Sequence, residues 1–307
     1  MVRDELYMAV TLLTVLEESL AKQGRRVVSD WRAALIIWKA TQQLPPGNRR
    51  WQAAPDSAQE ARPLLDRLAR KGNLKAIIKS AHLYQVTSPF ANVAPIQEYE
   101  VLMEANPYCA ISHHSAMAFH QLTLDFPNEI QVSVLKGRGG LLPIETTEAD
   151  WDFLARPVGR RITEIFNTGI RWHAVKSFAG VREARPSGYT IRVTNLERTL
   201  LDGLQDPDWC GGFDNVLSAW RMAKDLLNVN MLVKIADELN INLLRQRAGF
   251  ILERMGIDHP RLKEWQALAK RGGSSRLVAK APFAPTYDQN WSLSINAPLR
   301  SLDENAQ

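Results

Sequence analysis

Four side chains that could bind a metal lie within twelve residues of one another: Cys109, His113, His114 and His120. A zinc site needs ligands that converge on one tetrahedron. No Cys-x-x-Cys motif or second Cys/His pair completes such a set, and His113 and His120 lie two helical turns apart. We therefore expect these histidines to cap and pack, and the sequence predicts neither a metal nor a cofactor.

Other patterns give equally little sign of catalysis. Ser112 and His113 are neighbours, and neighbours on a helix do not face each other. There is no Gly-x-Ser-x-Gly motif, and the basic glycine turn at 136–140 lacks the Gly-Lys-Ser/Thr of a phosphate-binding loop. Arg198 and Asp202 stand at i and i+4, which predicts a surface or half-buried ion pair. We expect that the protein is not an enzyme.

Positive charge is concentrated near the N-terminus. Residues 1–90 hold fourteen Lys/Arg and eight Asp/Glu, a net of +6, whereas residues 91–307 have a net of −1. A basic segment joined to a nearly neutral one is typical of a polyanion-binding module attached to a body with another role. The alternative is that this excess lies within the ordinary scatter of charge in globular proteins.

The elements expected in the basic segment are those of a winged helix. We expect a helix over 7–23, a second from Ser29 to before Pro45, a third over 57–71 or from Pro63, and strands at 74–78 and 82–87. Such a module places its third helix in the major groove and its hairpin on the DNA backbone. The candidate DNA-binding residues are Arg62, Arg67 and Arg70 for the groove, Lys71, Lys75 and Lys79 for phosphate, and Arg49 and Arg50 in a basic loop. Solvated charges on a small packing domain, or a protein–protein adaptor, are the alternatives.

The rest of the chain alternates between short strands and amphipathic helices. Strands are expected at 108–111, 131–135, 169–176 and 188–193, and helices at 97–105, 112–122, 195–206, 213–227, 232–239 and 243–255. The predicted fold class is α+β, with a winged-helix domain at 1–90 and a larger mixed α/β domain at 97–307. Apolar runs are too short for a membrane span, and two cysteines in 307 residues fit a reducing compartment. We expect a cytoplasmic protein without a membrane partner.

Five strings occur in an order that resembles one protein family. They are LLDRLARKGNL (64–74), YCAISHHSA (108–116), VTNLERTLLD (193–202), RAGFILE (247–253) and NWS (290–292). On these residues the chain resembles the AbiEi antitoxins of type IV toxin–antitoxin systems, which act in phage defence. Ser80 and Ala81 stand where the family usually has Arg-Gly before the second wing strand.

The resemblance implies a two-domain antitoxin. Its winged helix would bind inverted repeats in double-stranded DNA at its own promoter and repress transcription, and its C-terminal domain would counteract a nucleotidyltransferase-like toxin without needing a direct complex. The motifs place a candidate antitoxin surface at Ser112, His113, Glu197, Arg198 and Asp202. Three alternatives stay open: an enzyme that reverses the toxin's modification, an orphan winged-helix regulator, and an adaptor that binds the toxin directly.

Overall fold

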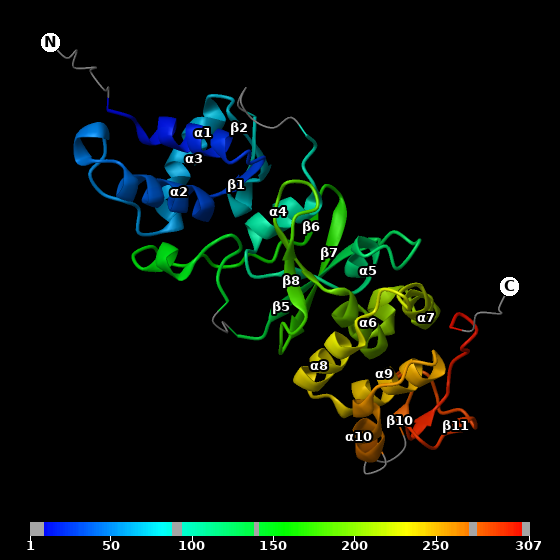
Figure 1. Ribbon diagram of the computed structural model, residues 1–307. Coiled ribbons are helices and arrows are strands. Elements are labelled where there is room, and N and C mark those ends of the chain that lie inside the picture. The colour runs from blue at the N-terminus through cyan, green and yellow to red at the C-terminus, as the bar shows by residue number, and fades with distance from the viewer. Residues whose placement is uncertain (1–8, 88–93, 138–140, 270–274, 303–307) are drawn as a thin grey trace. The chain divides into compact units, whose positions relative to one another are not determined.

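The computed structural model describes residues 9–87, 94–137, 141–269 and 275–302 (Figure 1). The chain divides into two compact units. Unit 1 comprises Met1–Cys109, Arg138–Asn167 and Arg185–Ile191, and unit 2 comprises Ala110–Gly137, Thr168–Ala184 and Arg192–Gln307. Unit 1 is thus not the continuous segment 1–90 of the division made from sequence, whose boundary at residue 90 lies outside the described residues.

Helices and a small sheet build the N-terminal part of unit 1. Its elements are α1 (Leu12–Lys22), β1 (Val27–Ser29), α2 (Asp30–Gln43), α3 (Arg62–Arg70), β2 (Leu74–Ile78) and β3 (Leu83–Val86). The sheet is antiparallel in the order β1-β3-β2, and Figure 1 shows it beside the three helices. The predicted strand at 74–78 is confirmed to the residue. The first helix starts later than predicted, at Leu12, and residues 7 and 8 lie outside the described chain.

Local chemistry sets the ends of these helices. Ser29 caps α2, since its side chain accepts from the backbone N–H of Arg32 at 3.2 Å, as its position in the sequence predicts. Pro63 lies in the first turn of α3, where a missing N–H leaves no hydrogen bond unmade. Gly72 follows α3 with φ +80°, the left-handed conformation that ends many helices.

Unit 1 also contains segments from farther along the chain. They are α4 (Glu98–Ala105), the short helix η4 (Glu148–Trp151) and β6 (Glu164–Ile165). Residues 144–160, called the strap below, run along the N-terminal elements. Trp151 and Leu154 of the strap belong to the same apolar core as Leu16, Leu65 and Leu68.

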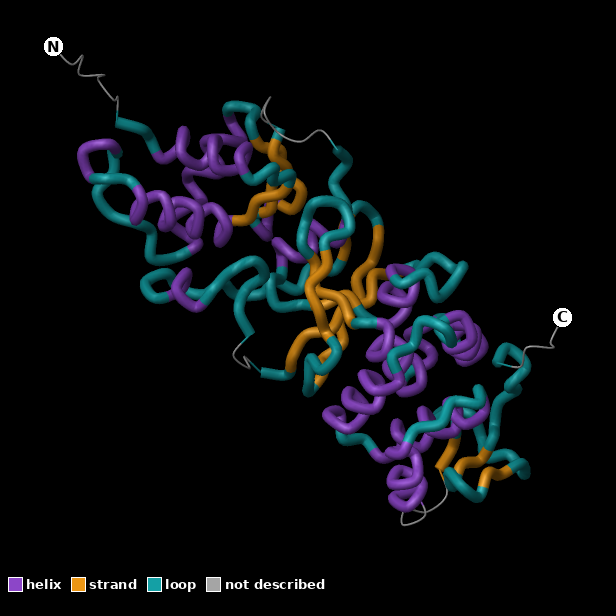
Figure 2. The backbone as a smooth tube through the Cα atoms, viewed as in Figure 1, coloured by secondary structure: helices purple, strands orange, loops and turns teal. Residues whose placement is uncertain are grey.

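Unit 2 joins a mixed sheet to a cluster of helices (Figure 2). Its strands lie in the order β7-β5-β4-β9-β8, with β5 parallel to β7 and antiparallel to β4. The strands are β4 (Ala110–Ile111), β5 (Glu129–Leu135), β7 (Thr168–Val175), β8 (Val181–Ala184) and β9 (Ile191–Thr194). Helix α5 (His113–Phe119) follows β4, as predicted, and the tip of the basic turn, 138–140, lies outside the described residues.

The helices of unit 2 share one apolar core with a small sheet near the C-terminus. They are α6 (Leu196–Gln205), α7 (Phe213–Met222), α8 (Val229–Leu239), α9 (Asn242–Arg254) and α10 (Pro260–Ala269), and the small strands are β10 (Ser275–Arg276), β11 (Tyr287–Asp288) and β12 (Leu293–Ser294). The mixed α and β composition is confirmed. Strand β8 and helix α10 were not predicted from sequence. Within the described residues, no helix is long and apolar enough to cross a bilayer.

Candidate nucleic-acid interface

Helix α3 turns one side to the core and the other to solvent. Leu65 and Leu68 are buried, whereas Arg67 and Arg70 are exposed. The two arginines lie three residues apart, so their side chains are neighbours on the helix surface. Both stand in the last turn, where the helix dipole favours positive charge. In the described part of the chain, both arginine side chains of α3 are therefore open to solvent.

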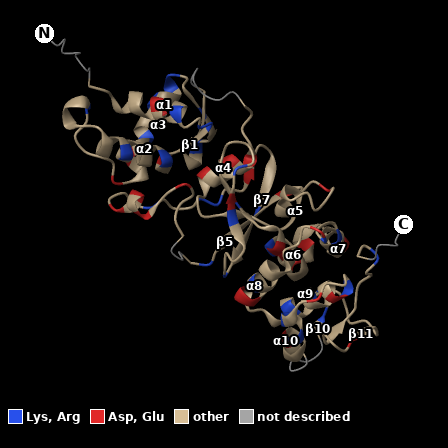
Figure 3. Ribbon diagram, viewed as in Figure 1, with Lys and Arg blue, Asp and Glu red and all other residues tan. Residues whose placement is uncertain are grey.

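The hairpin that follows α3 extends the basic surface. Lys71 at the C-cap of α3, Lys75 on β2 and Lys79 in the turn are all exposed. Among the described residues, strand β2 is at the edge of the sheet and pairs with β3 on one side only. Figure 3 colours the ribbon blue at Lys and Arg positions, and several blue stretches lie around α1, α2 and α3. Five of the eight predicted DNA-binding residues are thus brought together on α3 and its hairpin.

A tyrosine ties the hairpin to the helix. The Tyr84 hydroxyl donates to Asp66 Oδ1 at 2.8 Å. Burial, together with this hydrogen bond, raises the pKa of Tyr84 to about 12. The phenol is protonated at neutral pH and can therefore donate this hydrogen bond between β3 and α3.

Three predicted DNA-binding arginines lie elsewhere or are engaged. Arg62 Nε donates to Asp30 Oδ2 at 2.8 Å, so this half-buried guanidinium group pairs with a buried carboxylate. Arg49 is half-buried and its Nη1 donates to the Gln52 carbonyl oxygen at 3.2 Å. Arg50 is exposed in the connection between α2 and α3. Arg62 is therefore an ion-pair partner of Asp30, and its assignment to the groove stays a prediction.

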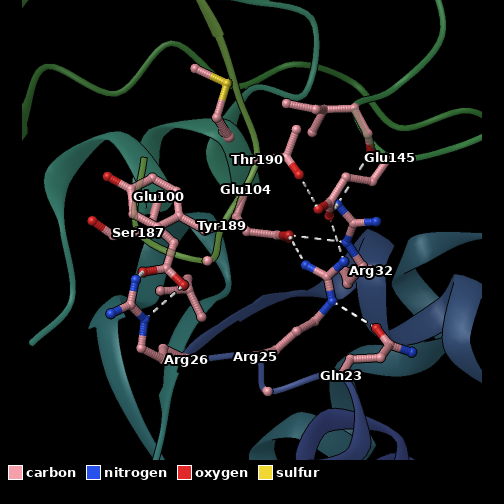
Figure 4. A pocket seen from close by; sticks show the side chains of 15 residues that line it. Gln23, Arg25, Arg26, Arg32, Glu100, Glu104, Glu145, Ser187, Tyr189 and Thr190 are labelled. Atoms are coloured by element: carbon pink, nitrogen blue, oxygen red, sulfur yellow. Dashed lines mark hydrogen bonds and ion pairs between the residues drawn. The ribbon is translucent and has the colours of Figure 1, made fainter. Parts of the chain in front are cut away.

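Unit 1 also contains a charged pocket of about 80 Å³ (Figure 4). Its arginines face its glutamates: Arg25 and Arg32 contact Glu104 at 3.2 and 3.0 Å, and Arg26 contacts Glu100 at 2.7 Å. Ligand pockets for drug-sized molecules are several times larger, roughly 300–1,000 Å³. Because its charges already pair with one another, the pocket is a structural ion-pair network.

The same network includes an acid from the strap. Glu145 Oε2 lies 2.6 Å from Arg25 Nη2, and Glu145 Oε1 accepts from Thr190 at 2.6 Å. Burial raises the pKa of Glu145, but Arg25, Thr190 and Arg32 together lower it to about 2. Glu145 is therefore ionised at neutral pH, and its contacts tie the strap to Arg25 and Arg32 of the N-terminal elements.

The five residues predicted to form an antitoxin surface are not exposed. They are all buried in unit 2, with exposed fractions between 0 and 7 %: Ser112, His113, Glu197, Arg198 and Asp202. Arg198 Nε donates to Asp202 Oδ1 at 2.7 Å, and Arg198 Nη1 donates to the carbonyl oxygens of Ser177 and Ala179 at 3.2 and 2.7 Å. The pair holds α6 to the loop after β7. The expectation of an exposed motif is wrong because these interior contacts use the polar groups.

Ser112 and His113 do contact each other, contrary to the expectation from helical spacing. Ser112 lies before α5 with an extended backbone, and His113 has φ +50°. The Ser112 Oγ therefore lies 2.8 Å from His113 Nδ1 and also accepts from Ser133 Oγ at 2.8 Å. Both residues are almost fully buried, with exposed fractions of 0 and 3 %.

Two further aromatic rings pack against this histidine. The His113 and His173 ring centroids lie 4.3 Å apart, and Trp209 lies 4.1 Å from His173. Burial, and after it the neighbouring His113, lowers the pKa of His173 to about 3. The predicted role of His113 in packing is consistent with this arrangement. Among the residues with described positions, no three His, Cys, Asp or Glu side chains converge on a possible metal position.

Comparison with known proteins adds little. No protein-family model and no curated protein matches the sequence. Among solved structures, the chain is similar to the crystal structure of the RV2827C protein from Mycobacterium tuberculosis. The two share 14% identical residues over 92% of this chain and 90% of that chain, with a TM-score of 0.49. A likeness this weak says nothing about function.

Proposed function

We propose that this protein is a DNA-binding antitoxin of the AbiEi type. In this proposal unit 1 acts as a winged helix that binds inverted repeats at its own promoter and represses transcription. Unit 2 counteracts a nucleotidyltransferase-like toxin. The protein has no enzymatic activity of its own. One observation carries the DNA-binding part: Arg67 and Arg70 lie on the solvent side of α3, next to a hairpin with exposed lysines.

The order of elements supports the winged-helix assignment. Helix, strand, two helices and an antiparallel hairpin follow one another from α1 to β3, and β1 completes the sheet. Helix α3 has nine residues and is therefore roughly 13 Å long. An α-helix with its side chains is about 10–12 Å in diameter, which fits a major groove about 12 Å wide. Arginine at such a position hydrogen-bonds guanine through two donors, and lysines on the hairpin neutralise phosphate.

The antitoxin part rests on the family resemblance. The motif at 193–202 forms the buried α6 and its cap, so it maintains the fold of unit 2. Counteraction of the toxin then depends on other residues of unit 2, or on an effect that needs no complex. The enzyme alternative gains no support from Ser112 and His113, because both side chains are closed off from solvent.

DNA binding is tested with the full chain and its upstream DNA. Arg67→Ala/Arg70→Ala removes the exposed guanidinium groups of α3, and Arg221→Ala/Lys234→Ala removes two exposed charges from unit 2 as a matched control. We expect the first variant to lose at least about tenfold in affinity, since one good base contact contributes about 1–3 kcal/mol. The control should bind as the wild type does. If the Arg67→Ala/Arg70→Ala variant binds the upstream DNA as tightly as the control variant does in a mobility-shift titration, the proposal is wrong.

A second experiment separates repression from neutralisation. The Arg67→Ala/Arg70→Ala variant, expressed from a foreign promoter together with the toxin encoded beside it, should still protect cells. It should fail to repress a reporter placed behind its own promoter. Loss of protection by a variant whose thermal melt equals that of the wild type would show that the two activities are not separable. If the gene beside this one does not encode a nucleotidyltransferase-like toxin, the protein is better described as an orphan winged-helix regulator.

A further inference from the structure

A fully buried carboxylate lies at the start of α2. Asp30 has no exposed surface, and its Oδ1 accepts from the backbone N–H of Trp31 at 2.9 Å. Two guanidinium groups neutralise it. Arg62 Nε donates to Oδ2 at 2.8 Å, and Arg160 Nη2 lies 2.6 Å from Oδ2 and 2.8 Å from Oδ1. A buried charge needs such partners, because its transfer from water costs several kcal/mol.

These contacts join three segments that lie far apart in the sequence. Asp30 is the first residue of α2, Arg62 is the first residue of α3, and Arg160 ends the strap. The turn of the hairpin is near as well. Burial lowers the pKa of His82 in that turn, and the charges of Arg62 and Arg160 lower it further. The carboxylate is thus a junction between the strap and the helix that carries the proposed DNA-reading side chains.

The strap itself is held firmly on both sides of this junction. The Ala155 N–H donates to the Asp56 carbonyl oxygen at 2.8 Å, and the Arg160 N–H donates to the Ala105 carbonyl oxygen at 3.0 Å. Gly159 lies so close to Asn106 that a Cβ there would be 2.4 Å from its Oδ1. The Arg160 main chain therefore has little freedom, and its guanidinium group is presented to Asp30 from a rigid support.

We infer that Arg160 is a positioning residue for DNA recognition by α3. This inference rests on the proposed function of unit 1. Arg160 touches no DNA; it holds Asp30, and through Asp30 and Arg62 it sets the N-terminal end of α3. A tilt of about 10° at that end moves the far end of a helix roughly 13 Å long by about 2 Å. Such a shift breaks two-donor contacts to a base edge, whereas phosphate contacts tolerate it.

We therefore expect the Arg160 variant to discriminate less between DNA sequences, while its contacts to DNA phosphates stay unchanged. We define discrimination as the ratio of the Kd for a scrambled duplex to the Kd for the promoter duplex, with equal length and composition. Arg160→Met in the full chain should lower this ratio at least about tenfold. Its Kd for the scrambled duplex and the slope of log Kd against log salt should stay those of the wild type. Arg161→Met, at an exposed neighbour, is the matched control and should leave the ratio unchanged.

Two further variants keep the inference open to refutation if Arg160→Met folds poorly. Arg160→Lys retains the charge but lacks the planar donor arrangement, so the ratio should fall less than in Arg160→Met. The double variant Asp30→Asn/Arg160→Lys should have the same discrimination ratio as Asp30→Asn alone, or a higher one. The two changes act through one contact, so their effects should not add. Circular dichroism and thermal melts identify the temperature at which every variant is folded, and binding is measured there.

Each outcome decides a separate point. A salt slope lower by about one in Arg160→Met would mean that Arg160 binds phosphate directly, and the inference would be wrong. An unchanged ratio in folded Arg160→Met and Arg160→Lys would also refute it, while the proposed function would stand. If the wild type binds no duplex DNA, the proposed function fails, and the positioning role fails with it.

Discussion

The buried ion pair between Arg198 and Asp202 offers the sharpest test of the fold of unit 2. Their spacing in the sequence indicated a pair at or near the surface, where such pairs contribute about 0.2–1 kcal/mol. In the structure their exposed fractions are only 4 and 5 %. Arg198→Met removes the contact to Asp202 and two hydrogen bonds to the carbonyl oxygens of Ser177 and Ala179. The remaining carboxylate is then a buried charge without its cation.

The magnitude follows from that burial. Removal of one partner from a buried pair costs about 3–5 kcal/mol in the free energy of unfolding. We expect this for Arg198→Met and for Asp202→Leu, which in a unit of this size lowers the Tm by roughly 6–20 °C. The double variant leaves no buried charge, so its cost should be no greater than that of the costlier single variant. The carbonyl oxygens of Ser177 and Ala179 also lose their donor in both Arg198 variants, so part of the cost should remain in the double variant.

Urea denaturation of the four proteins measures these free energies, and hydrogen exchange of residues 196–205 localises the loss to α6. Promoter DNA binding by unit 1 serves as the control and should stay unchanged in all four. Single variants that each cost under about 1 kcal/mol, with additive effects in the double variant, would refute the argument. They would show that water reaches the pair in solution.

Three further changes test other parts of the chain. Gly249→Ala should cost at least about 1–3 kcal/mol, because a Cβ there would lie 2.0 Å from the rigid ring of Trp291; thermal melts that equal the wild type would contradict this packing. The pKa of His173 is lowered to about 3 by burial and then by His113. Between about pH 6.5 and 3, His173 is therefore protonated in the unfolded chain and neutral in the folded chain. Stability should therefore fall as the pH drops from about 6.5 toward 3, and His173→Gln should reduce that slope by up to about 1.4 kcal/mol per pH unit in urea titrations. Tyr84→Phe removes the hydrogen bond between β3 and α3 and should cost about 0.5–1.5 kcal/mol; no change in urea midpoint would mean that the bond is absent in solution.

Much of the secondary structure was predictable because its signals are local. Ser29 and Asn195 cap α2 and α6 as expected, since a side chain that accepts from a backbone N–H three residues on depends only on neighbouring residues. The third helix and the hairpin also follow from Pro63, Gly72 and the apolar spacing. Helix α10 was missed although Pro260 at its first position is a known start signal and its buried Leu262, Trp265 and Ala269 stand at i, i+3 and i+7.

The sequence by itself determined the identity of most elements, the N-terminal concentration of positive charge and the presence of several arginines on α3. These follow from side-chain spacing and helix ends, which involve residues a few positions apart. Only the tertiary structure decided which charges are free. Arg62 and Arg67 look alike in the sequence, yet Arg62 pairs with Asp30 and Arg67 faces solvent. Asp30, the partner of Arg62, and Arg160 beside it lie far from Arg62 in the sequence. A pattern of neighbouring residues therefore cannot predict these contacts.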